Sequence, residues 1–459
     1  MIKKLILIFI LLTQSAFSQI ISKDNSFASN GKFTISGNNN YWSRMFQNPD
    51  GSIYFIYNKN NSSGTEKSFL SKLTATGIVD TTFGLNGELE LPYVSTDSKL
   101  KKQSDGKLLV FGFNNGAAIT RILPNGQIDT TFGINGTSLI PELGVDQNDA
   151  SYGIILQNGK IIVHGMEGTT GQIHHKIYRI DSNGIIDNAF GNNGSVLTQG
   201  TWSSGSFVLL DNQSNIVNLT NTGIMEKFDS NGQPLTSFGN NGVLQISYSF
   251  SNFGTGTALM DSNNNIIYAN IDAEIIKIKP DGTVDSTFNF DPAILPSPIW
   301  ITNIIEKNGY YYISGANEDS NSTYFISRLT QNGSIDSVFN YFIETDSTLV
   351  KIEDLIVNDN NIIANGGGYV VKYLFNNTLS TGETVRSNTD IAFENPVKES
   401  FEYFSKNKIG KINIYSIDGK LLKTFKKNNT PASDLAKGIY IANIIFENGT
   451  SSTIKLIKN

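Results

Sequence analysis

The sequence predicts an all-β protein: a β-propeller of seven blades, with six or eight as alternatives, followed by a small Ig-like β-sandwich. Three observations predict this fold. Asn, Gly, Ser, Thr and Ile dominate while only 17% of residues are charged, a composition typical of short strands joined by polar turns. A turn signature recurs at fixed offsets along most of the chain. A short apolar run lies ahead of each copy of that signature, so the chain is built from repeats.

The signature is a basic residue, a glycine five positions later and a phenylalanine six positions after the glycine. An Asn or Asp usually precedes the glycine, which predicts a two-residue hairpin turn. A seventh, incomplete copy has Lys372 with Asn377 at the glycine position, and no phenylalanine follows it. The complete copies contain Gly77 and Phe83, Gly126 and Phe132, Gly184 and Phe190, Gly232 and Phe238, Gly282 and Phe288, and Gly333 and Phe339.

The apolar runs ahead of the signatures, such as residues 108–110 and 161–163, are nearly continuous. Consecutive apolar residues indicate a strand that is covered on both faces, as the inner strands of a propeller blade are. Repeats of about 50 residues fit four-stranded blades better than the shorter coils of an open β-solenoid. We expect residues 32–36 to add a strand to the last, incomplete blade and so to close the ring.

The residues also carry a family resemblance. The stretch from Arg121 to Gly136 reads Arg-Ile-Leu-Pro-Asn-Gly-Gln-Ile-Asp-Thr-Thr-Phe-Gly-Ile-Asn-Gly. It resembles the delta-60 repeat, a bacterial repeat assigned to β-propellers. Four copies match well; the copy around Leu235 lacks the usual Asp, and the last two lack the Phe-Gly pair. The resemblance covers residues 20–377 and implies a fold, but it implies no defined activity.

The first 18 residues are typical of a secretory signal peptide. Lys3 and Lys4 precede an apolar run, residues 5–12, that is too short to anchor the chain in a bilayer. Small residues precede a predicted cleavage site between Ser18 and Gln19. The chain has no cysteine, which excludes disulfides and a lipid-bearing cysteine. We therefore expect a secreted or cell-surface protein without a transmembrane helix; a buried N-terminal strand is the alternative interpretation.

The formal net charge of −6 conceals an asymmetry. Residues 391–459 contain eleven Lys and six Asp or Glu, a balance of +5. With the two lysines of the leader set aside, residues 19–390 carry −13. A segment with this negative charge is unsuited to binding nucleic acid or an anionic membrane, although it could attract cations.

Beyond residue 377 the chain changes character. Residues 378–391 have no strand periodicity and are predicted to be a linker. Residues 392–459 contain alternating segments separated by turns, the pattern of a small antiparallel sandwich. This module resembles the type A sorting domain of the type IX secretion system of Bacteroidota. The matching residues include Asn395, Pro396, Tyr415, Asp418, Gly419, Lys420, Gly438, Tyr440 and Lys455.

The resemblance implies export across the outer membrane by the type IX machinery, which is the expected partner of this module. Removal of the module or its attachment at the cell surface would follow. The alternative is an ordinary sandwich used for binding. The predicted organisation is a signal peptide (1–18), a propeller (19–377), a linker (378–391) and a sorting domain (392–459).

Signals for catalysis, cofactors or metals are weak, and we expect none of the three. His174 and His175 are neighbours on one predicted strand, so they face opposite ways and are interpreted as a solvated hairpin tip. His164 lies at a strand end. Asp261 begins a calcium-like loop in which Ile266 takes the place of the required glycine, which favours a plain turn. The aspartates three residues before the repeat phenylalanines are expected to cap turns; they are Asp80, Asp129, Asp187, Asp285 and Asp336.

The leading hypothesis is a non-enzymatic binding or scaffold propeller whose extracellular ligand, a glycan or a protein, the sequence does not identify. Its longer loops, residues 141–149, 166–172 and 292–300, are candidate binding loops. Trp202 and Trp300 could stack on sugars, although core packing is the simpler interpretation. The alternative is a secreted carbohydrate-active enzyme, a glycoside hydrolase or lyase, which would need paired carboxylates. Its candidates are Glu306, Glu344, Asp346, Glu353 and Asp354.

Overall fold

The computed structural model describes residues 20–35, 44–61, 63–93, 99–113, 115–143, 153–169, 172–201, 206–220, 223–246, 256–270, 273–295, 299–317, 324–349, 352–376, 391–416, 419–448 and 451–458. The chain divides into two units between Asn376 and Asn377. Apart from one 3₁₀ helix, η1 (Pro292–Ile294), every helix or strand in these ranges is a β-strand. The all-β prediction is therefore confirmed. The predicted signal peptide with its cleavage site, and residues 378–390 of the predicted linker, lie outside the described residues.

The described residues of the larger unit form seven antiparallel sheets. The first three contain β3 (Met45–Gln47), β4 (Ile53–Asn60), β5 (Glu66–Leu73) and β6 (Glu88–Glu90); β7 (Lys99–Lys102), β8 (Leu108–Phe113), β9 (Ala117–Ile122) and β10 (Thr137–Ile140); and β11 (Gly153–Gln157), β12 (Lys160–Thr169), β13 (Gln172–Ile180) and β14 (Ser195–Thr201). The next three contain β15 (Ser206–Leu210), β16 (Ile216–Thr220), β17 (Ile224–Phe228) and β18 (Val243–Gln245); β19 (Thr257–Met260), β20 (Ile266–Ala269) and β21 (Ile275–Ile278); and β22 (Ile299–Lys307), β23 (Tyr310–Asn317), β24 (Tyr324–Leu329) and β25 (Tyr341–Ile343). The last sheet contains β26 (Ile352–Val357), β27 (Asn361–Gly366) and β28 (Tyr369–Phe375) together with β1 (Ile21–Lys23) and β2 (Lys32–Thr34).

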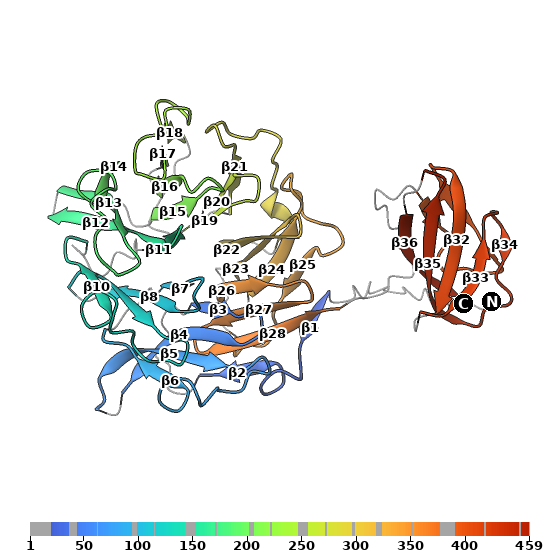
Figure 1. Ribbon diagram of the computed structural model, residues 1–459, viewed down its shortest axis with the longest axis horizontal. Helices are drawn as coiled ribbons and strands as arrows, with labels where there is room; N and C mark the ends of the chain where they lie inside the picture. Colours follow the sequence, from blue (N-terminus) through green and yellow to red (C-terminus); the bar gives the residue numbers. More distant parts are fainter. Residues whose placement is uncertain are drawn as a thin grey trace, which may run out of the picture. The chain divides into compact units, whose positions relative to one another are not determined.

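The sheets are arranged radially in a ring that closes on itself (Figure 1). The first strand of each sheet lies innermost, and these strands contact one another in the order β3, β7, β11, β15, β19, β22 and β26. Strand β26 in turn contacts β3. A closed ring of radial antiparallel sheets is a β-propeller, so the predicted fold class is confirmed.

Separate apolar clusters fill the interfaces between neighbouring sheets. Between the second and third sheets, for example, Ile119 packs in one cluster with Val163. Between the last and first sheets, Ile363 and Val370 share a cluster with Phe55. Both faces of an inner strand are therefore buried, which explains the continuous apolar runs in the sequence.

The N-terminal segment completes the last sheet, as predicted. Strand β2 pairs with β28 through Phe33 and Val370. Strand β1, which the sequence pattern does not predict, also pairs with β28. In Figure 1 the blue strands β1 and β2 lie beside the orange strand β28. The two ends of the propeller sequence thus share one sheet, which leaves no free edge at the seam.

The repeat signature links each sheet to the next, as the second and third sheets illustrate. Arg121 stacks on Phe132, with 4.6 Å between the guanidinium carbon and the ring centre, and pairs with Asp129 at 2.8 Å. Its Nη1 donates to the backbone oxygen of Ser182 in the next sheet at 2.5 Å. A Cβ on Gly184 would lie 2.8 Å from the backbone nitrogen of Gly133. We call this set of contacts the inter-sheet clasp; it explains why the offsets are constant.

The turn type predicted for the signature glycine is wrong. Gly126 has a φ of +85° while Asn125 keeps an ordinary negative φ, so the turn has one left-handed residue where a type I′ turn needs two. The later Asn135-Gly136 pair supplies the two-residue turn, with φ of +51° and +93°. It joins Ile134 to Thr137. The chain therefore reverses twice per signature, first beside the neighbouring sheet and then into the outermost strand.

The smaller unit is also all-β. Its main sheet has the order β33 (Leu421–Phe425), β32 (Ile409–Ser416), β35 (Gly438–Phe446) and β36 (Ser451–Lys458). Two short pairings cover one face: β29 (Ile391–Phe393) with β31 (Tyr403–Ser405), and β30 (Ser400–Phe401) with β34 (Thr430–Pro431). The core between them includes Ile412, Ile414, Tyr440 and Phe401.

Candidate functional site

The repeat aspartates cap turns, as the sequence predicts. Oδ1 of Asp80 accepts the backbone N–H of Thr82 at 3.1 Å and its hydroxyl at 2.6 Å. Asp129, Asp187, Asp285 and Asp336 accept the N–H two residues on in the same way. Several also pair with the signature's basic residue, as Asp80 does with Lys72 at 2.8 Å. These carboxylates are used by the fold and do not gather into one site.

Three of the five acidic residues that were candidates for catalysis make contacts that stabilise the fold. Glu344 and Asp346 meet Lys23 of β1, at 3.4 and 2.8 Å from its Nζ. Glu344 also accepts the backbone N–H of Asp346 at 2.9 Å and the hydroxyl of Tyr373. Glu306 accepts the backbone N–H of Ser262 at 2.6 Å and its hydroxyl at 2.8 Å. These contacts anchor the N-terminal segment and join the fifth and sixth sheets.

The remaining two acids, Glu353 and Asp354, lie at a β-bulge in the innermost strand β26. Arg44, directly before β3, donates from Nη1 to the backbone oxygen of Glu353. Asp354 accepts the backbone N–H of Met45 at 3.0 Å. Lys101 of β7 interacts electrostatically with both Arg44 and Asp354. Charges from the last, first and second sheets thus come together near the ring axis.

Asn365 on β27 lies directly opposite Asp354, and paired residues on adjacent strands project from the same face of a sheet. Its side chain is only 1% exposed. Within the described ranges, neither its Oδ1 nor its Nδ2 has a hydrogen-bond partner. A buried amide of this kind is ordinarily satisfied by water or by a polar ligand group. We refer to Arg44, Lys101, Asp354 and Asn365 as the axial cluster.

Burial shifts the pKa values of two charged groups in the axial cluster, Asp354 and Lys101. It raises the pKa of Asp354, and the charge of Arg44 offsets part of that shift. It lowers the pKa of Lys101, and the charge of Asp354 opposes that change. The Lys101 side chain is exposed to solvent, although neighbouring protein groups lower its pKa. Opposite charges with perturbed pKa values in one place are typical of functional sites.

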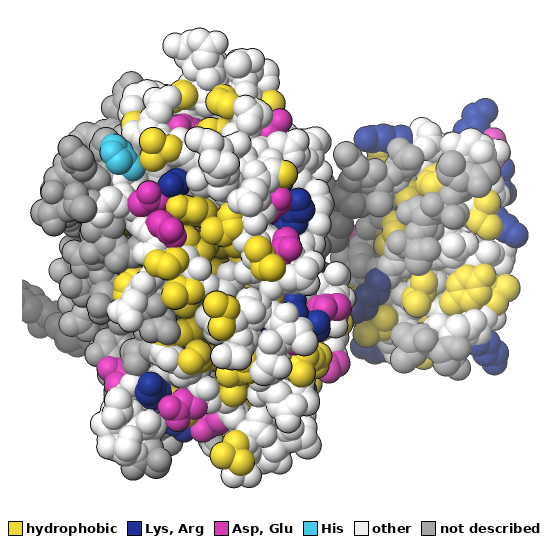
Figure 2. All heavy atoms as spheres, turned by 60° about the vertical axis from the view of Figure 1, so that its left-hand side comes forward, with side chains coloured by type: hydrophobic (Ala, Val, Ile, Leu, Met, Phe, Trp, Pro, Cys, Tyr) yellow, Lys and Arg dark blue, Asp and Glu magenta, His cyan; other side chains and the backbone are white. Residues whose placement is uncertain are grey.

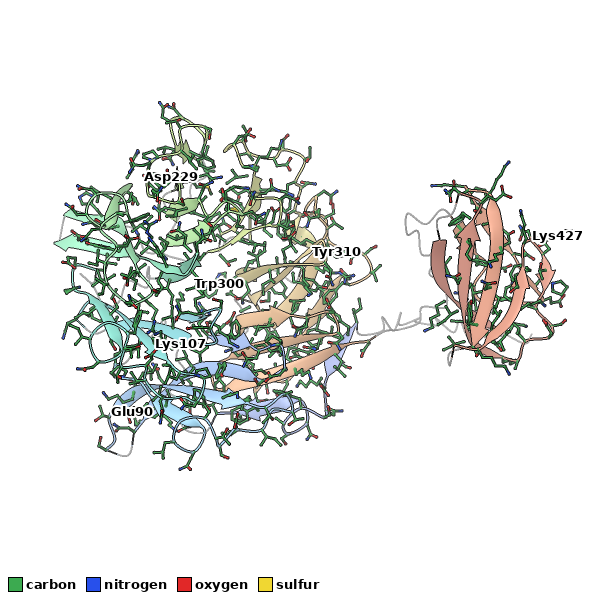
Figure 3. The ribbon with its side chains drawn as sticks, in the orientation of Figure 1. Glu90, Lys107, Asp229, Trp300, Tyr310 and Lys427 are labelled. Atoms are coloured by element: carbon green, nitrogen blue, oxygen red, sulfur yellow. The ribbon has the colours of Figure 1, made fainter. Side chains whose placement is uncertain are left out.

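Trp300 lies at the same end of the ring axis. Each sheet begins with its innermost strand, so these strands run in one direction along the axis. Strand β22 has a bulge at Thr302, whose hydroxyl donates to the backbone oxygen of Ile352 at 3.2 Å. Trp300 is 41% exposed and lies towards the middle of the ring in Figure 3. Core packing is therefore the wrong interpretation for Trp300, while Trp202 lies outside the described residues.

The other candidate positions are structural. His174 is exposed whereas His175 is only 2% exposed. The two side chains therefore face opposite ways, as predicted. The prediction that both are solvated is wrong for His175. His164 is buried against Gly153. Asp261 accepts the backbone N–H of Asn265 at 2.7 Å, the contact of a plain turn. In the described part of the chain, no group of three His, Asp or Glu side chains is arranged to hold a metal ion.

The sorting-motif residues divide by position in the smaller unit. Asn395, followed by a cis bond to Pro396, accepts the backbone N–H of Ile457 at 2.8 Å and so holds β36. Tyr440 points into the core and donates to the backbone oxygen of Ala436 at 2.7 Å. Gly438 begins β35, Gly419 has a φ of +84° before Lys420, and Asp418 lies outside the described residues. Tyr415 and Lys455 lie on the face of the main sheet that turns away from the core.

Comparison with known proteins agrees with both units. Residues 392–459 match the family described as the secretion system C-terminal sorting domain. Residues 103–132 match a β-propeller domain of unknown function. No curated protein matches the chain. Among the described residues, no helix is long and apolar enough to cross a membrane.

Three solved structures that are similar to this chain are distant from it in sequence. BamB from Moraxella catarrhalis is 13% identical, with a TM-score of 0.45, over 75% of this chain and 98% of that one. The N-terminal part of BBS1, solved in complex with ARL6, is 10% identical, with a TM-score of 0.47, over 76% and 96%. PorZ, a surface component of the type IX secretion system of Porphyromonas gingivalis, is 10% identical, with a TM-score of 0.30, over 93% and 75%. None of these values supports an argument about what the chain binds.

The closed ring and the matched C-terminal unit define the class: an exported β-propeller protein. Its smaller unit is a type IX secretion sorting domain, and the protein is secreted to the medium or to the outer cell surface. The secretion machinery is accordingly a partner of this unit.

Proposed function

We propose that the protein is a non-enzymatic binding module that the sorting domain delivers outside the cell. Its ligand is held at the end of the ring axis by Trp300 and the axial cluster. The observation that carries this proposal is an exposed indole at the same end of the ring axis as a group of charges that the fold does not use for its repeat. Exposed aromatic rings with a few convergent polar groups are typical of binding sites.

The chemistry of the site favours a polar ligand with an apolar face, such as a glycan. Trp300 offers a stacking surface, Arg44 and Lys101 offer donors, and Asp354 and Asn365 offer acceptors. The same arrangement argues against hydrolysis. Both oxygens of Asp354 accept backbone N–H groups, from Met45 and Leu355 at 3.0 Å each, which supports a positioning role.

A glycan array with the exported protein tests the proposal. Trp300→Ala is expected to reduce binding about tenfold or more, as loss of a central aromatic commonly does. Tyr341→Ala is the matched control, because Tyr341 is a similarly exposed aromatic, at 38%, on the outermost strand β25. Equal loss in the two variants, or no loss in either, would contradict the site. Glycan cleavage that Asp354→Asn abolishes would contradict the non-enzymatic proposal.

A further inference from the structure

The main sheet of the sorting domain has two faces of different character. Along β35, Tyr440, Ala442, Ile444 and Phe446 are buried, as alternation requires for the core face. The alternate residues, beginning with Ile439 and Ile441, turn to the opposite face. That face has no covering element among the described residues, since both short strand pairings contribute to the core.

The uncovered face carries an apolar row that crosses three strands. Tyr415 of β32 pairs with Leu421 of β33 on one side and with Ile441 of β35 on the other. Leu421 is 51% exposed and Ile441 is 36% exposed. Ile439, 41% exposed, lies two residues before Ile441. We call Tyr415, Leu421, Ile439 and Ile441 the outer patch.

Packing of this unit does not explain the outer patch. A sheet whose other face meets water ordinarily carries polar residues there, and the same face does so further along, at Asn413 and Asn443, which pair with each other. The exposed apolar residues gather at one end of this face, while Ile445 at its other end is half-buried. A contiguous exposed apolar patch of this kind marks an interaction site.

Lysines project from the same face as the outer patch. Lys455 of β36 pairs with Ile441 and borders the patch directly. Lys411 of β32 pairs with Ile445, beyond Asn413 on the same face. Both are exposed, and within the described residues neither has a carboxylate within 4 Å. A partner surface with an apolar centre and an acidic rim would fit this arrangement.

We infer that the outer patch with its lysine rim is the surface by which the type IX secretion machinery recognises this protein. This inference rests on export through the sorting domain and adds the location and chemistry of the contact. The partner is a protein component that presents apolar side chains bordered by Asp and Glu. Two side chains of the matched motif, Tyr415 and Lys455, project from this face, where recognition rather than core packing accounts for them.

Secretion of the full chain tests the inference. The double variant Leu421→Asp with Ile441→Asp, expressed in a bacterium with the type IX system, is expected to reduce the secreted fraction about tenfold. The matched control is Phe404→Asp, because Phe404 is 72% exposed on β31, outside the main sheet. It is expected to be secreted as the parent is. Circular dichroism and protease resistance of the retained chain show that the double variant is folded.

Four outcomes are informative. Retention of a folded double variant together with normal export of the control supports the inference, and Lys411→Glu with Lys455→Glu then reduces secretion as well. Normal secretion of the double variant overturns it. A parent chain that dimerises in solution through the patch, with monomeric and normally secreted variants, also overturns it, because the patch is then a contact between copies. Normal secretion after deletion of residues 391–459 would instead contradict export through this domain.

Discussion

Lys372 and Asp24 lie at opposite ends of the propeller sequence and form an ion pair, with 3.1 Å between Nζ and Oδ2. The pair reproduces the contact of Lys72 with Asp80 inside the first repeat, at 2.8 Å. Phe27 follows Asp24 by three residues, as Phe83 follows Asp80. The N-terminal segment therefore supplies the carboxylate and the phenylalanine that the seventh copy of the repeat lacks.

Phe27→Ala tests this closure. Phe27 is 1% exposed, in the cluster between the last and first sheets, and truncation of a buried phenylalanine costs about 3–5 kcal/mol. We expect a clearly lower Tm of the propeller, measured by circular dichroism, together with faster proteolysis near the N-terminus. Phe404→Ala, at an exposed position of the smaller unit, is the control. An unchanged Tm for Phe27→Ala would show that the seam does not depend on this side chain.

A pair of glycine variants separates the inter-sheet clasp from backbone strain. Gly126 and Gly159 have nearly the same φ, +85° and +82°. A Cβ at Gly126 would lie 2.3 Å from the backbone nitrogen of Gly84 in the preceding sheet, whereas a Cβ at Gly159 would meet nothing within 4 Å. Gly159→Ala is expected to cost about 1 kcal/mol from φ alone, and Gly126→Ala clearly more. Equal shifts in urea midpoint would show that the close approach of the sheets carries no energetic weight.

The sequence predicts the repeat, the fold class and the closing strand because these depend on short apolar runs and on turn residues at fixed offsets. It misses Asp24 and Phe27 because the matching segment stands at the other end of the chain. The pattern Asp-x-x-Phe-x-x-Asn-Gly in residues 24–31 and 80–87 would have revealed them. The axial cluster could not be found in this way: Arg44, Lys101 and Asp354 belong to three sheets, and only ring closure brings them together.

Acid is expected to weaken the clasps. The ammonium of Lys72 and the hydroxyl of Thr82 lower the pKa of Asp80 below its usual value. A carboxylate with a depressed pKa stabilises the fold above the unfolded pKa, about 3.9 for Asp, and that stability is lost as the pH falls through the folded pKa. The Tm of the parent should therefore stay nearly constant between about pH 7 and pH 5 and decrease below about pH 4.

Asp80→Asn isolates this contribution. At pH 7 the variant should be less stable by about 0.5–1 kcal/mol, a modest value because the pair is partly exposed to solvent. At about pH 3 the gap between parent and variant should narrow, because protonation removes the charge from the parent as well. Thermal unfolding of both proteins across this range measures the gap. A gap that stays constant with pH would mean that the charge on Asp80 does not stabilise the clasp.

Asn365→Leu distinguishes an amide kept for binding from one kept for folding. Asn365 has no partner for its side chain among the described residues, whereas the equally buried Asn58 accepts a hydrogen bond from Ser68 at 2.7 Å. An apolar side chain of similar shape removes the cost of a buried unpaired group, so Asn365→Leu should stabilise the ligand-free protein by about 1 kcal/mol. Asn58→Leu removes the acceptor of this buried hydrogen bond and should destabilise the protein by about 1–3 kcal/mol. Urea unfolding measures both changes, and glycan binding is measured on the same samples. A stabilised Asn365→Leu protein that binds less is the expected result; a destabilised one that binds normally would make Asn365 part of the fold, satisfied by water, and would remove it from the binding site.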